Sequence, residues 1–178
     1  MKIVIVNGRG RVGKDLFCEY AHDNCGLVYP ISTVDRVKQV ALFAGWSGEK
    51  DARGRKFLSD LKDAMSEYDD LPRKYVLDWM RQKLDIYEGS MVGTDDIVFL
   101  VHAREPEDIK RWVEENGARA LLIHRPDAEK SWGNHADDEV ENYDYDYYLT
   151  NDGSLYDWKR KSINFIDKIK HESWESKI

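Results

Sequence analysis

The stretch Gly8-Arg9-Gly10-Arg11-Val12-Gly13-Lys14-Asp15 decides the fold of this 178-residue chain. It follows a short apolar, β-branched run at 2–6 (KIVIV) and leads into a segment at 14–24 whose apolar residues recur at helical spacing. Its glycines and lysine have the GxxxxGK spacing of a phosphate-binding P-loop, a motif that requires a strand before it and a helix after it. The sequence therefore predicts a P-loop over residues 8–15.

Each part of this motif has a chemical reason. Glycines let the backbone curl around a phosphate with its N–H groups pointing inward, and the helix that follows adds the positive end of its dipole. Lys14 brings a point charge to the β- and γ-phosphates. Asp15 stands where Ser or Thr is usual, and a carboxylate also binds Mg²⁺. We therefore predict ATP and Mg²⁺ as cofactors, with residues 8–15 as the binding loop and Asp15 as the metal ligand; Arg9 and Arg11 are also open to a role as solvated loop residues.

Outward from this loop, strands alternate with helices. The expected strands cover 2–6, 27–31, 96–103, 119–124 and 147–150. The expected helices cover 14–24, 34–44 (capped by Ser32 or Thr33), 55–68, 73–88, 106–116 and 154–170. This order predicts an α/β fold of the P-loop NTPase type, a parallel five-stranded sheet sandwiched by helices. We expect a single domain over 1–178, with a helical insertion at about 45–90 and a lid at about 125–140.

The composition excludes several classes of partner. The chain has 27 Lys and Arg against 34 Asp and Glu, a net charge of −7, which disfavours nucleic acid and anionic membranes. It has no apolar run long enough to span a bilayer. The two cysteines, Cys18 and Cys25, form no CxxC pair and indicate reduced thiols in the cytoplasm. The five histidines show no metal-ligand spacing.

Basic residues nevertheless occur throughout this acidic chain. Phosphoryl transfer between two anions needs cations around the moving group, because its transition state spreads charge over the phosphoryl oxygens. Arg104 directly follows the strand expected at 96–103, and the carboxyl ends of parallel strands face the ligand crevice. We therefore predict that Lys14 and Arg104 take part in catalysis. No general base stands out, which is compatible with an acceptor that is already ionised.

Segments spread over most of the chain share a pattern with one known kinase family. They are Gly13-Lys14-Asp15, Val34-Asp35-Arg36-Val37-Lys38, Arg55-Lys56-Phe57-Leu58-Ser59-Asp60-Leu61, IVFLVHAREP at 97–106, and the stretches 135–139 and 147–153. The chain resembles the deoxynucleoside monophosphate kinases of bacteriophages and bacteria, to which animal-type phosphomevalonate kinases are related.

The resemblance implies transfer of the γ-phosphate of ATP to a small phosphorylated acceptor, with a (deoxy)nucleoside monophosphate favoured. It also implies which residues contact that acceptor or form the lid. Those expected at the acceptor are Asp35, Lys38, Arg53, Arg55 and Arg104, and the lid cations are Arg125 and Lys130. A monomer or homodimer is expected.

Three features depart from the family pattern. The lid segment from Arg125 to His135 has only Arg125 and Lys130 as cations, and Ala136-Asp137 follows His135 where the family has Ser-Glu. His102 takes the place of an aspartate that lies two residues before Arg104 in the family and assists the metal ion. Two alternatives therefore stay open. The acceptor is a phosphorylated alcohol that is not a nucleotide, or the chain is a nucleotide-binding sensor or interaction protein with weak or no turnover.

Overall fold

The computed structural model describes residues 1–91, 93–126, 140 and 142–178. The chain divides into two compact units, each described here by itself. The first unit comprises Met1–Pro30 and Gly89–Ile178, and the second comprises Ile31–Glu88. Among the described residues, no helix has both the length and the apolar character that crossing a bilayer requires.

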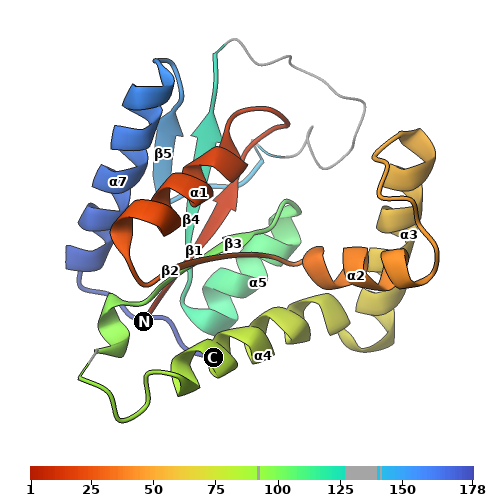
Figure 1. The fold of residues 1–178 in the computed structure, drawn as a ribbon, viewed down its shortest axis with the longest axis horizontal. Coiled ribbons are helices and arrows are strands. Elements are labelled where there is room, and N and C mark those ends of the chain that lie inside the picture. Colours follow the sequence, from red (N-terminus) through yellow and green to blue (C-terminus); the bar gives the residue numbers. More distant parts are fainter. Residues whose placement is uncertain (92, 127–139, 141) are drawn as a thin grey trace. The chain divides into compact units, whose positions relative to one another are not determined.

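A five-stranded parallel sheet forms the centre of the fold, as the sequence predicts (Figure 1). Its strands are β1 (Lys2–Asn7), β2 (Val28–Ser32), β3 (Val98–His102), β4 (Arg119–His124) and β5 (Tyr147–Thr150), in the spatial order β2-β3-β1-β4-β5. All six residues of β1 are buried, which is expected of a central parallel strand covered on both faces. The sheet therefore delivers the carboxyl end of β1 to the edge where β3 and β4 also end.

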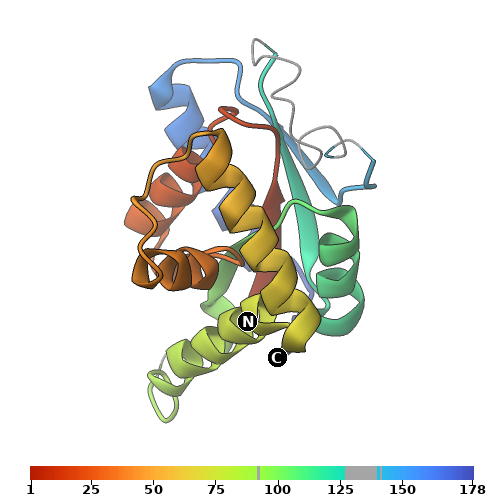
Figure 2. The same ribbon diagram turned by 90° about the vertical axis from the view of Figure 1, so that its right-hand side faces the viewer.

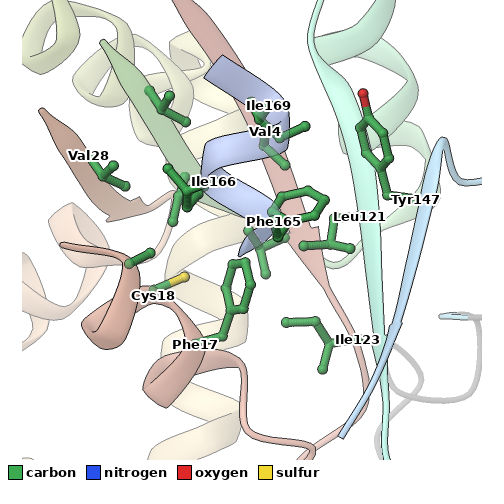
Figure 3. Close-up of a cluster of buried hydrophobic side chains, with 14 of the residues drawn as sticks. Val4, Phe17, Cys18, Val28, Leu121, Ile123, Tyr147, Phe165, Ile166 and Ile169 are labelled. Carbon is green, nitrogen blue, oxygen red and sulfur yellow. The ribbon is translucent and has the colours of Figure 1, made fainter. Parts of the chain in front are cut away.

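Helices α1 (Lys14–Cys25) and α7 (Leu155–His171) pack together over one face of the sheet. Val4 and Val6 of β1 point into the core on this face, where Phe17 packs with its ring centroid 5.7 Å from that of Phe165 (Figure 3). Since side chains alternate along a strand, Ile3 and Ile5 point to the opposite face. Helix α5 (Pro106–Asn116) lies there, so helices cover both faces (Figure 2).

The second unit is helical, with α2 (Asp35–Phe43), α3 (Ala52–Asp69) and α4 (Leu71–Asp85) packed on one another. A single-turn helix, η1 (Thr94–Asp96), precedes β3 in the first unit. The expected helix over 55–68 begins three residues earlier than predicted, at Ala52. The Asp51 side chain accepts a 2.6 Å hydrogen bond from the Gly54 backbone N–H and caps the helix there, so Gly54 lies inside the helix rather than in the preceding loop.

The start of α2 also differs from the prediction. Neither Ser32 nor Thr33 is the residue at its cap position; that position is taken by Val34, whose side chain makes no capping bond. The carboxylate of Asp35 instead reaches back and accepts a 2.9 Å hydrogen bond from the Ser32 backbone N–H. The carboxylate thus binds a backbone donor just before the helix, where an acid also interacts favourably with the helix dipole.

Candidate phosphate-binding site

Residues 8–15, termed the phosphate loop below, join the carboxyl end of β1 to the first turn of α1. Two of its glycines cannot be replaced without strain. Gly8 has φ +147°, and a Cβ there would lie 2.4 Å from the Ile123 carbonyl oxygen of β4. Gly13 has φ +96°, and its Cβ would lie 2.6 Å from Nδ2 of Asn151. The loop therefore needs glycine at both positions because neighbouring strands and turns press against its backbone.

Three side chains hold the loop from outside the motif. Nδ2 of Asn7 donates to the Arg104 carbonyl at 3.1 Å, and its Oδ1 accepts from the Gly8 N–H at 2.8 Å. Nδ2 of Asn151 donates to the Val12 carbonyl at 2.9 Å. Nε1 of Trp158 donates to the Gly13 carbonyl at 3.1 Å. These bonds engage the Gly8 N–H and the Val12 and Gly13 carbonyls of the loop. The course of the loop backbone is therefore fixed by the end of β1, the turn after β5 and the first turn of α7.

Sequence reasoning missed these three residues. Asn7 directly precedes the first glycine and is fully buried, with Nδ2 also donating to the Tyr145 hydroxyl at 2.8 Å. Tyr145 in turn donates to the Val140 carbonyl at 2.7 Å. Burial is the main reason that the pKa of Tyr145 is raised to about 12. The phenol therefore stays protonated and can both donate and accept a hydrogen bond. The sequence does show an asparagine directly before the first glycine of the motif, which could have indicated that Asn7 supports the loop. It does not show which groups the Asn7 side chain bonds.

Lys14 lies over the loop with only 8% of its surface exposed. Its Nζ donates to the carbonyls of Gly8 and Arg9, the latter at 3.2 Å. An ammonium group is therefore already held inside the curve of the loop, at the positive end of α1. This arrangement concentrates positive potential where an anion can approach the loop.

The other side chains of the loop differ in exposure. Val12 is buried in the core that α1 and α7 share with the sheet, so its side chain anchors the loop. Arg11 is exposed and has φ +62°, a left-handed conformation in the middle of the loop. Arg9 is half-buried, and the Asp15 side chain is almost fully exposed.

The carboxyl end of β3 lies beside the loop. His102, its last residue, has Nδ1 3.7 Å from an Asp15 carboxylate oxygen and Nε2 3.1 Å from Sγ of Cys18. Burial raises the pKa of the Cys18 thiol, with Asp15 adding to the shift, so the thiol is neutral. The Arg104 backbone is tied to Asn7, and its side chain is exposed. The structure thus brings Lys14, Asp15, His102 and Arg104 to one edge of the sheet.

The donor set suits a magnesium ion that takes most of its ligands from a nucleotide. Mg²⁺ in proteins is held by one or two carboxylates together with water and substrate phosphates, and Asp15 offers one exposed carboxylate at the end of the loop. Within the described ranges, no group of three or more His, Cys, Asp or Glu side chains is placed to hold a metal by itself. Asp15 therefore fits an ion that arrives with phosphate ligands.

Four of the predicted site residues lie in the second unit. Asp35 and Lys38 are paired with each other at 3.0 Å on the first turn of α2. Arg53 and Arg55 are exposed on the first turn of α3, and neither guanidinium is paired with another side chain in the part of the chain that the structure describes. The second unit therefore has two exposed arginine side chains on the first turn of one helix.

The predicted lid falls largely outside the described residues. Arg125 is exposed just beyond β4, at the same edge of the sheet as the phosphate loop. Lys130 lies outside the described residues, as does most of the range at about 125–140. The prediction of a lid there stays a prediction.

No family model and no curated protein matches the chain. Among solved structures, the chain is similar to a dephospho-CoA kinase from Campylobacter jejuni, with 15% identity and a TM-score of 0.46 over 94% of this chain and 97% of that one. It is also similar to a sugar kinase from a Janibacter species, solved without ligand, with 13% identity and a TM-score of 0.46 over 94% and 95%. A third is FlhF complexed with GMPPNP and Mg²⁺, with 14% identity and a TM-score of 0.32 over 96% of this chain and 62% of that one.

Proposed function

We propose that the chain is a phosphotransferase that moves the γ-phosphate of ATP to a small phosphorylated acceptor. The observation that carries this proposal is the phosphate loop. Gly8 and Gly13 are sterically required, Asn7, Asn151 and Trp158 bond the loop backbone from outside it, and the Lys14 ammonium lies inside its curve. A loop of this kind between a buried parallel strand and a helix binds nucleotide phosphates.

The chain's own groups would act as follows. Backbone N–H groups of the loop and the amino end of α1 bind the donor phosphates, and Lys14 exchanges its loop carbonyls for β- and γ-phosphate oxygens. Arg104, exposed beside the loop, neutralises charge on the phosphoryl group. Asp15 is the residue that would hold Mg²⁺, which would supply positive charge to offset that of the donor phosphates.

In this reaction, an oxygen of the acceptor phosphate forms a bond to the γ-phosphorus of ATP. The bond between that phosphorus and the β,γ-bridging oxygen breaks, and ADP leaves with the electron pair. The acceptor oxygen is already ionised, so the protein needs to position it and stabilise charge rather than remove a proton.

We propose a (deoxy)nucleoside monophosphate as the acceptor and the α3 arginines as its ligands. Arg55 and Arg53 are exposed on the first turn of α3, and no side chain among the described residues pairs with either guanidinium. A guanidinium binds a phosphate through two parallel hydrogen bonds. Asp35 and Lys38 form an ion pair on the neighbouring helix, which offers a carboxylate and an ammonium for sugar or base contacts. The resemblance to deoxynucleoside monophosphate kinases supports the same assignment.

A coupled assay of ADP release tests this proposal. The acceptors are the four common deoxynucleoside monophosphates, their ribose counterparts and phosphomevalonate as a phosphorylated alcohol. We expect Arg55→Ala to raise the KM for the preferred acceptor about tenfold or more and to leave the KM for ATP unchanged. Arg81→Ala is the control, since Arg81 is an exposed arginine of the same unit, paired with Asp78 at 2.8 Å. Turnover with phosphomevalonate and with none of the nucleotides would contradict the nucleotide acceptor and favour a phosphorylated alcohol.

A nucleotide-binding protein without turnover is the second candidate. The observation that favours it is His102, which stands at the end of β3 where the family resemblance calls for an aspartate. Calorimetry separates the two candidates. Binding of ATP without binding of any acceptor in the panel, together with no release of ADP, would favour the sensor and contradict the kinase.

A further inference from the structure

His102 lies between the exposed carboxylate of Asp15 and the buried thiol of Cys18. Its Nε2 is 3.1 Å from the Cys18 sulfur, and its Nδ1 is 3.7 Å from an Asp15 oxygen. The imidazole comes from the last residue of β3, whereas the other two groups lie three residues apart on the first turns of α1. Strand and helix thus fix the ring between the core and the phosphate loop.

The contact with Cys18 orients the ring. Cys18 is buried in the core shared by α1 and α7, and its sulfur is a neutral thiol that can accept as well as donate a hydrogen bond (Figure 3). In the tautomer in which Nε2 carries the hydrogen, Nε2 donates to Sγ, and Nδ1, which lies 3.7 Å from an Asp15 oxygen, carries a lone pair. Histidines that bind metals are held in this way, with the second ring nitrogen donating to a fixed partner.

The distance between Nδ1 and the carboxylate oxygen also suits a shared ion. At 3.7 Å it is too long for a hydrogen bond. Two neighbouring ligands that each lie about 2.1 Å from one ion are on the order of 3–3.5 Å apart. A shift of a few tenths of an ångström by the exposed Asp15 side chain closes the difference, so one nitrogen and one oxygen can bind the same cation.

We propose that His102 and Asp15 together bind the divalent ion that accompanies the donor nucleotide, and that the imidazole shifts the preference of this site from Mg²⁺ toward first-row transition ions. This inference rests on the proposed function, because two protein ligands complete a coordination shell only with phosphate oxygens and water. Mg²⁺ is a hard ion that favours oxygen, whereas imidazole binds transition ions well. An aspartate at position 102 would give the site two carboxylates and the ordinary preference for Mg²⁺.

The test uses Mn²⁺ and inorganic tripolyphosphate, a probe without nitrogen. Pulsed electron paramagnetic resonance of the complex should show coupling of Mn²⁺ to a nitrogen nucleus in the wild-type protein. His102→Asp should abolish that coupling and lower the preference for Mn²⁺ over Mg²⁺ about tenfold in competition titrations. His171→Ala is the matched control; His171 is an exposed histidine at the end of α7 and should leave both results unchanged.

A second measurement makes the result independent of the folding of the variant. Wild-type protein is produced with histidine labelled with ¹⁵N. If a histidine binds the ion, the coupling of Mn²⁺ to nitrogen should change to that of ¹⁵N. Bound Mn²⁺ with no nitrogen coupling in the wild-type protein would overturn the inference, even where ATP still phosphorylates an acceptor. Absence of any binding of tripolyphosphate and ATP would overturn the inference and the proposed function together.

Discussion

The two ends of the central strand each have a buried lysine beside them, and the two lysines differ in what they bind. Lys2, at the amino end of β1, is 4% exposed, and its Nζ donates to the carbonyls of Ile169, Lys170 and Glu172 at 2.6, 2.7 and 2.8 Å. Lys14, beyond the carboxyl end, is 8% exposed, and its Nζ donates to two carbonyls of the phosphate loop.

The difference lies in the element that supplies the acceptors. The partners of Lys2 are the carbonyls of Ile169 and Lys170 in the last turn of α7 and that of Glu172 after it, at the negative end of the helix dipole. Lys2 therefore fixes the end of α7 to the sheet. The partners of Lys14 belong to a glycine-rich loop, where phosphate oxygens can replace them without disrupting a helix. A buried lysine is thus found at both ends of the strand. The feature that indicates a binding site is that phosphate oxygens can replace the carbonyl partners of the lysine.

Replacing Lys14 gives the largest expected change in activity. Lys14→Ala should lower kcat about a thousandfold, because it removes the cation from the donor phosphates. The thermal midpoint should change little, since the loop remains held by Asn7, Asn151 and Trp158. The ADP-release assay and a thermal melt measure the two quantities. Lys110→Ala, at an exposed lysine of α5, is the control, and equal turnover in both variants would contradict the role of Lys14.

Replacing Lys2 should have the opposite outcome. Lys2→Met removes the ammonium group that donates to three carbonyls and should lower the free energy of unfolding by about 3 kcal/mol, measured by urea denaturation. Turnover per folded molecule should be unchanged. A variant of normal stability with impaired turnover would remove the distinction between the two ends of the strand.

Replacing Arg104 tests whether a second cation acts together with Lys14 at the carboxyl end of β1. Arg104→Ala should lower kcat about a hundredfold and leave the dissociation constant of ATP within about threefold of the wild type, because its charge is needed most in the transition state. Calorimetry with ATP and the steady-state assay measure the two quantities. An effect confined to ATP affinity would assign Arg104 to binding alone.

Asn151 has the smallest expected effect. Asn151→Ala removes the 2.9 Å bond to the Val12 carbonyl and should lower the free energy of unfolding by about 1 kcal/mol. It should also weaken ATP binding about fivefold, because the loop is then held less firmly. A urea titration and calorimetry with ATP provide the measurements. Unchanged ATP affinity at reduced stability would show that this bond supports only the fold.

Much of the fold follows from local patterns in the sequence. The buried strands, the GxxxxGK spacing and the proline at the start of α5 are local signals, and the elements they predict are those that the structure has. Local signals were weaker at the ends of elements. The helix expected over 55–68 left Gly54 outside it, but the carboxylate of Asp51 caps the helix ahead of that glycine.

The parts of the site that the sequence did not reveal depend on contacts between distant residues. Asn7 meets the Arg104 carbonyl and Tyr145, and Asn151 meets Val12, across separations of more than 90 residues. No local pattern sets these pairs; the strand order does, because it brings the carboxyl ends of β3, β1 and β4 to one edge. The contact of His102 with Cys18 arises in the same way. The substitution at position 102 was visible in the sequence, but the groups it faces were not.

Transfer of label from ATP tests the central claim most directly. The protein is incubated with ATP radiolabelled in its γ-phosphate and with each deoxynucleoside monophosphate, and the products are separated by chromatography. We predict that label appears in a nucleoside diphosphate with the wild-type protein and that Lys14→Ala transfers it about a thousandfold more slowly. Label that remains in ATP, or that appears only as inorganic phosphate, would contradict the assignment of this chain as a phosphotransferase acting on a phosphorylated acceptor.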